Sequence, residues 1–151
     1  MATDLEKVEN MFRIQQIQIF GVTKGLWDFV EDSAFALSPN MGEQVLNVME
    51  NEMGLDLNGD KPVQVLNNIS QLFIDEFSIA EKIEIEELNN VYRLKVHQYV
   101  FNKISSQLEH AGVKDFICPV MNASVAALRR LNLKVRSNTE NNGADYSTID
   151  I

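Results

Sequence analysis

The stretch that decides the fold runs from Val96 to Ile151. It opens with VHQYVF at 96–101, continues through a helical repeat to Gly112, and reaches FICP at 116–119. A second helical segment follows, and the chain closes with GADYSTIDI at 143–151. This order predicts a strand that ends at His97, a helix, another helix that starts after Cys118, and a final strand. His97 and Cys118 are the side chains best suited to bind a metal or to act as a nucleophile.

The chain before this stretch is helical first and then changes its period. Apolar residues spaced by three and four predict a helix over 4–32, although residues 16–20 alternate and could form a short strand instead. Pro39 and Pro62 mark two further helix starts. The segments Met41–Met53 and Val63–Phe77 carry the apolar faces of those helices.

The strands are expected later in the chain. Ile83 and Ile85 alternate with charged residues, and so do Tyr92, Leu94 and Val96, with Asn89-Asn90 suited to the turn between them. This pattern predicts a hairpin with one wet face. Leu133 and Val135 suggest a third strand, residues 138–143 a polar turn, and residues 147–151 a fourth strand. The prediction is a single α+β domain over residues 1–151, with N-terminal helices packed on a small antiparallel sheet.

Composition and charge exclude several classes of protein. The chain has 151 residues, a net charge of −9 and a pI of about 4.6. Such a charge opposes binding to nucleic acid or to an anionic membrane surface. The N-terminus lacks the features of a signal peptide, and no uncharged apolar run approaches the ~18 residues needed to span a bilayer. One Cys forms no internal disulfide, so we expect a cytoplasmic protein.

The decisive stretch resembles a superfamily of small α+β domains that includes vinyl-reductase-type hydrocarbon-binding proteins and 2-aminothiazoline-4-carboxylate hydrolase-like proteins. Their pattern is a strand ending in Cys-x-x-aromatic, a helix, a Gly, a Cys at a helix start, and a hairpin of the type Gly-Asp-x-Cys-x-Phe-x-Ile. Here His97 replaces the first Cys, Gly112 and Cys118-Pro119 match the middle, and residues 143–151 match the end with Ser147 in place of the last Cys. The helical first half agrees only in order and length, an order also similar to that of vesicle-tethering subunits.

The resemblance implies a domain that binds a small apolar or aromatic ligand, as a sensor or carrier of the kind found in prokaryotic signalling proteins. Its ligand would lie in an apolar cavity between helices and sheet. The expected ligand-binding residues are Cys118, His97, Tyr99, Phe101 and Met121. Related domains commonly pair, so a homodimer built on the early helices is expected, and no cofactor is identified.

Other interpretations of the same residues remain open. Cys118 at a helix start could have a lowered pKa, or it could be a small core residue. His97 and Cys118, with a carboxylate such as Asp115, could hold zinc, although no close His or Cys spacing supports a metal. The same two residues could serve a hydrolase or a metal-assisted enzyme, but the sequence shows no complete catalytic set, so no catalytic residue is assigned. A third possibility is a non-catalytic dimeric partner protein.

Overall fold

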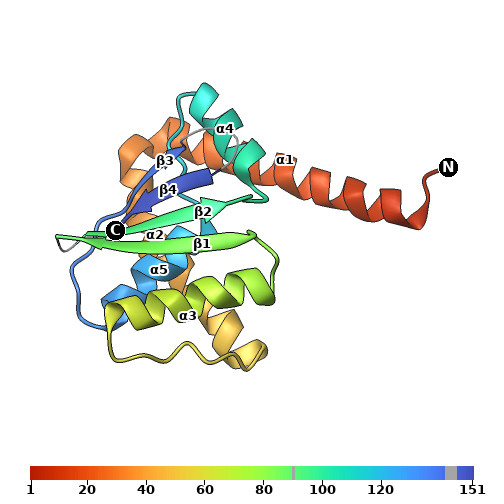
Figure 1. Cartoon of the computed structure of the whole chain (residues 1–151). Coiled ribbons are helices and arrows are strands. Elements are labelled where there is room, and N and C mark those ends of the chain that lie inside the picture. Colours follow the sequence, from red (N-terminus) through yellow and green to blue (C-terminus); the bar gives the residue numbers. More distant parts are fainter. Residues whose placement is uncertain (90, 142–145) are drawn as a thin grey trace.

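The computed structural model, which describes residues 1–89, 91–141 and 146–151, confirms the α+β class. Helices α2, α3 and α5 pack on one face of an antiparallel sheet whose strand order is β1-β2-β4-β3 (Figure 1). The strands are β1 (Lys82–Leu88), β2 (Val91–His97), β3 (Asn138–Asn141) and β4 (Tyr146–Asp150). The helices are α1 (Asp4–Val30), η1 (Glu31–Leu37), α2 (Ser38–Asn47), η2 (Val48–Glu52), α3 (Pro62–Asp75), α4 (Asn102–His110) and α5 (Pro119–Arg130).

Helix α1 is continuous through the segment that could have been a strand. A capping box starts it: the backbone N–H of Glu6 donates to Thr3 Oγ1 at 3.3 Å, and the backbone N–H of Thr3 donates to Glu6 Oε2 at 2.7 Å. Phe20 and Trp27, one heptad apart, then pack against a small cluster that includes Ile104 and Leu108. The alternation at 16–20 is therefore overridden by contacts at helical spacing.

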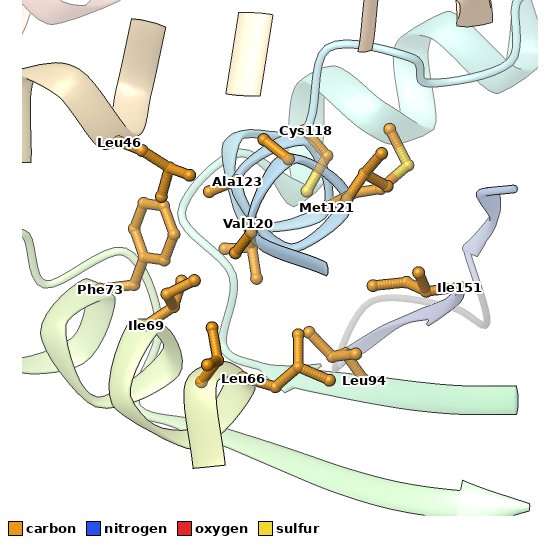
Figure 2. Close-up of a cluster of buried hydrophobic side chains, with 14 of the residues drawn as sticks. Leu46, Leu66, Ile69, Phe73, Leu94, Cys118, Val120, Met121, Ala123 and Ile151 are labelled. Atoms are coloured by element: carbon orange, nitrogen blue, oxygen red, sulfur yellow. The ribbon is translucent and has the colours of Figure 1, made fainter. Parts of the chain in front are cut away.

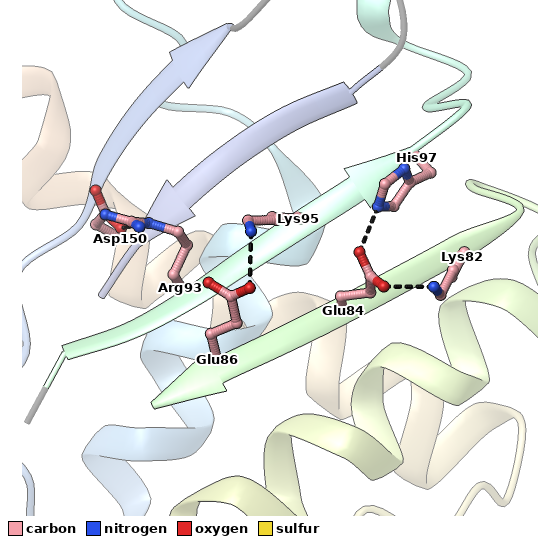
Figure 3. A network of polar contacts seen from close by, with 7 residues as sticks. All are labelled: Lys82, Glu84, Glu86, Arg93, Lys95, His97 and Asp150. Atoms are coloured by element: carbon pink, nitrogen blue, oxygen red, sulfur yellow. Dashed lines mark hydrogen bonds and ion pairs between the residues drawn. The ribbon is translucent and has the colours of Figure 1, made fainter. Parts of the chain in front are cut away.

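The predicted hairpin is confirmed, together with its wet face. Strands β1 and β2 pair with Ile83 opposite Val96 and Ile85 opposite Leu94. Charged side chains occupy the other face, where Lys95 Nζ lies 2.7 Å from Glu86 Oε1 and Arg93 Nε lies 3.0 Å from Asp150 Oδ1 (Figure 3). Strand β2 also pairs with β4, which makes β2 an inner strand of the sheet.

The third strand is not where the sequence placed it. Residues 133–137 are irregular, and β3 lies at Asn138–Asn141, inside the stretch expected to be a polar turn. This strand pairs only with β4 and forms an edge of the sheet, where polar residues are common. Apolar periodicity therefore gave no signal for it. The rest of the expected turn, residues 142–143, lies outside the described residues.

Helix α5 occupies the centre of the core (Figure 2). Val120 and Met121 are buried among side chains from α2, α3 and the sheet, including Leu46, Phe73 and Leu94. Helices α2 and α3 thus bury their apolar faces within their own chain.

The crossing of α2 and α5 is very close. A Cβ atom added to Gly42 would lie 1.9 Å from the carbonyl oxygen of Asn122 and 2.8 Å from the Cβ of Ala126. Only glycine allows the two backbones to approach in this way. At the end of α5, Arg130 donates to Glu43 of α2 and to Glu50 of η2, at distances from 2.8 to 3.2 Å.

Candidate functional site

A groove of about 620 Å³ lies between α1, α4 and the segment that leads into α5. This surface is called the apolar groove below. Its apolar lining comes from Ile19, Val22, Phe101, Ile104, Ile117 and Pro119. The volume falls in the range of about 300–1,000 Å³ that is usual for small-molecule sites.

Apart from Gln18, which is exposed, the polar side chains of the groove bond to one another or to the backbone. The Tyr99 hydroxyl donates to Cys118 Sγ at 3.4 Å, and the Ser105 hydroxyl donates to Asp115 Oδ2 at 2.6 Å. Asp115 Oδ1 accepts the backbone N–H of Ile117 at 3.1 Å, and Thr23 donates to the carbonyl of Ile19 at 2.6 Å. These groups are satisfied within the protein, so a ligand would meet mostly apolar surface.

Burial controls the ionisation of these groups. It raises the pKa of the Cys118 thiol to about 12, and the nearby Asp115 carboxylate adds to that effect. The backbone N–H groups of Val120 and Met121, at the start of α5, act in the opposite direction but do not outweigh burial. Burial also raises the pKa of Asp115 and of Tyr99. The lowered pKa that the helix start suggested for Cys118 is therefore not found.

The structure brings together three of the five expected ligand-binding residues. Tyr99, Phe101 and Cys118 all line the apolar groove. Met121, in the first turn of α5, is fully buried in the core and does not line the groove.

His97 lies away from the groove, on the charged face of the sheet. Its Nε2 atom is 2.8 Å from Glu84 Oε2, and Lys82 binds the same carboxylate (Figure 3). Val96, one residue earlier, is buried on the other face with Cys118. His97 and Cys118 therefore do not converge on one site.

The residues that sequence reasoning missed come from two parts of the chain. Ile104 in α4 and Ile117 just before α5 lie within the decisive stretch but carry no chemical signal of their own. Ile19 and Val22 belong to α1, whose apolar spacing predicted a helix but gave no sign of a ligand site. Phe29, near the end of the same helix, is 89% exposed.

Three further observations bear on other kinds of site or on membrane insertion. Among the described residues, no group of three or more His, Cys, Asp or Glu side chains could hold a metal ion. A hollow of about 1,100 Å³ near the end of α5 is lined by Arg129, Lys134 and Arg136 together with Tyr92. It contains none of the expected ligand-binding residues. None of the helices in the described part of the chain combines the length and apolar character that crossing a bilayer requires.

Comparison with known proteins gives one finding. No curated protein matches the chain. A family model described as "Putative rubredoxin C-terminal domain" matches residues 14–148, which run from within α1 to the first residues of β4. The chain belongs to this Putative rubredoxin C-terminal domain family.

Proposed function

We propose that this domain binds a small, largely apolar or aromatic molecule in the apolar groove and acts as a sensor or carrier. The observation that supports the proposal is the groove itself, whose volume suits a small molecule and whose lining is mainly aliphatic and aromatic. The resemblance to hydrocarbon-binding domains points to the same class of ligand, and the groove is formed partly by residues of that stretch, among them Tyr99 and Cys118.

The paired polar groups narrow the class of ligand further. Tyr99, Ser105, Asp115 and Cys118 already bond within the protein. A ligand that needed these hydroxyl groups as hydrogen-bond donors would have to break these bonds, at a cost of about 1–3 kcal/mol for each buried group left unsatisfied. An apolar molecule leaves them intact, so the arrangement favours hydrocarbons and simple aromatic compounds.

The family's name raises the question whether this chain holds a thiolate-bound iron. Sulfur-only tetrahedral sites use four thiolates. This chain has one Cys, and its thiol is buried with a pKa raised to about 12. The donor set does not fit such a centre, so no step of the proposed function involves iron.

The enzymatic alternative, a hydrolase or metal-assisted enzyme using Cys118 and His97, has less support. A Cys nucleophile reacts as the thiolate and needs a lowered pKa or an adjacent base. Here burial raises the pKa of Cys118, and His97 binds Glu84 on the charged face of the sheet.

Thermal unfolding in the presence of naphthalene tests the proposal. Ligand at tenfold its Kd stabilises a protein by about 1.4 kcal/mol, which raises the Tm by about 3–6 °C for a domain of this size. Ile117→Asp, which places a charge in the groove, should abolish the shift. Ile117→Trp, which fills the groove without adding charge, should also abolish the shift. It serves as the test variant if Ile117→Asp folds poorly.

Two control variants define the expected contrast. Val100→Asp changes an exposed apolar residue just outside the groove, and His97→Gln changes the charged face of the sheet. Both should keep the wild-type shift. An equal shift in the Ile117 variants, or no shift with naphthalene, indole or n-octane, would overturn the proposal.

A further inference from the structure

The first half of α1 extends beyond the rest of the protein (Figure 1). The helix has 27 residues, which corresponds to a length of about 40 Å. Leu5 is 71% exposed and Val8 is 58% exposed, and the first residue of α1 with a ring contact to the body is Phe12, against Phe101 at 6.1 Å. Isolated helices shorter than about 12–15 residues are marginal in water. The projecting part of α1 is a short helix of this kind, so a partner that covered its exposed apolar residues would stabilise it.

A set of eight residues on α1, most of them exposed and apolar, follows a heptad pattern, while Met11, Ile14 and Ile17 are also exposed but lie outside it. Spacings of three and four alternate without interruption through Leu5, Val8, Phe12, Gln15, Ile19, Val22, Leu26 and Phe29. This set is called the heptad stripe below. It contains no charged residue and one polar residue, Gln15. Phe20, Thr23 and Trp27, which pack on the chain's own body, lie on the neighbouring side of the helix, and within the stripe Phe12 makes a ring contact with Phe101. Most of the heptad stripe stays exposed and can pack against another helix.

The heptad stripe is continuous with the apolar groove. Ile19 and Val22 belong to both, because they line the groove on its α1 side. A helix that packed along the stripe would therefore also lie across the open side of the groove.

We propose that two copies of this chain pair through their heptad stripes as antiparallel helices, and that the α1 helix of each copy covers the apolar groove of the other. The pairing has twofold symmetry, so the same surface is used twice and the assembly closes as a dimer. The extended half of each α1 then lies beside the groove-bearing half of the other.

The positions of the stripe fit an antiparallel register. In such a pair Leu5 faces Phe29 of the second copy, Val8 faces Leu26, Phe12 faces Val22, and Gln15 faces Ile19. All layers are thus apolar except for the two that contain Gln15, and a single polar residue of this kind fixes the register of paired helices.

The parallel alternative is less favourable. Asp4 and Glu9 lie on the two sides of the stripe, at the positions that come into contact between parallel helices. Parallel pairing would therefore place Asp4 of one copy beside Glu9 of the other. Antiparallel pairing puts these like charges at opposite ends and also opposes the two helix dipoles.

The register makes a single copy incomplete as a binding site. Phe12 and Gln15 of the second copy come to lie opposite Val22 and Ile19, over the groove. The second copy thus supplies one aromatic and one amide side chain to the binding surface, and it removes the groove from bulk water.

Light scattering on the whole chain tests the pairing. The wild type should have twice the monomer mass of 17.1 kDa, and Val8→Glu should return the mass to that of one chain. The matched control is Ile17→Glu, because Ile17 is 64% exposed but lies on the opposite side of α1, outside the stripe. It should leave the dimer intact. A monomeric wild type, or a dimer lost only in Ile17→Glu, would overturn the inference.

Disulfide formation tests the orientation. The double variant L5C/F29C should form covalent dimers on oxidation, while L5C alone should not. Cys118 is buried and should stay out of the reaction. Covalent dimers from L5C alone, and no increase in the double variant, would show a parallel pair instead.

These measurements need no ligand, so they separate this inference from the proposed function. A monomer that still binds naphthalene would overturn the dimer and leave the groove's function standing. A dimer that binds no apolar probe would overturn the proposed function and leave the pairing of the two copies standing.

Discussion

The Cys118 thiol shows how burial decides the chemistry of a residue. Its position before Pro119 suggested a reactive thiolate, yet the folded protein raises its pKa from an ordinary 9.0 to about 12. The native state therefore holds the proton more tightly than the unfolded state does. The stabilising contribution is complete below pH ~9 and is lost as the pH rises from there towards 12.

Urea unfolding of wild type and Cys118→Ala at pH 7, 8.5 and 10 measures this effect. The free energy of unfolding of the wild type should fall faster with pH, by up to about 1.4 kcal/mol per pH unit above pH 9. Groups that do not interact with Cys118 contribute equally to both curves and cancel in the comparison. Tyr99, whose pKa is raised partly by Cys118, loses that part in the variant, which adds to the difference in the same direction. Parallel curves, together with rapid labelling of the native thiol, would show that Cys118 ionises freely.

The alternation of side chains along strand β2 explains why His97 does not lie beside Cys118. Successive strand residues point to opposite faces, so Val96 enters the core and His97 joins Glu84 outside. The sequence places His97 correctly at the end of a strand. Which face meets Cys118 depends on where α5 packs, and that is decided by contacts between distant segments.

At the scale of elements, the contact between α2 and α5 depends on Gly42. Replacement by Ala would force a Cβ atom against the Asn122 carbonyl, and neither backbone can move without disturbing the buried residues around it. We expect Gly42→Ala to lower the free energy of unfolding by about 1–3 kcal/mol or more, as overpacking does elsewhere. Chemical denaturation followed by circular dichroism would measure it.

Gly21→Ala is the matched control for that substitution. Gly21 also lies inside a helix, but a Cβ atom there meets nothing within 4 Å. Ala favours the helix by about 0.8–1.0 kcal/mol over Gly, so this variant should be as stable as the wild type or more stable. Equal effects at the two positions would mean that the close crossing of α2 and α5 is not required.

The elements differ in how far the sequence could predict them. Pro39 and Pro62 marked two helix starts correctly because proline acts through local geometry. The hairpin was also predictable, since alternation and an Asn turn are local signals. Strand β3 was not, because its polar residues form a strand only through pairing with β4.

The apolar groove belongs to the whole molecule, and that is why the sequence could name only part of it. Tyr99, Phe101 and Cys118 were expected at a ligand site from the resemblance in the last third of the chain. Ile19 and Val22 come from α1, far away in sequence, and join the groove only because Phe20 and Trp27 hold that helix against α4.

Ligand binding and pairing should be coupled if each copy covers the groove of the other. By linkage, naphthalene must tighten the dimer by the same factor by which the dimer tightens naphthalene binding. Sedimentation equilibrium should therefore show a lower dimer dissociation constant with naphthalene in the wild type, and no change in Ile117→Asp, whose groove is blocked. A coupling of 1–3 kcal/mol is typical and corresponds to about 5- to 150-fold. If naphthalene binds but leaves the dissociation constant unchanged, the groove lies outside the dimer interface, because covering a ligand without a change in its affinity would require the second copy to make no contact with it.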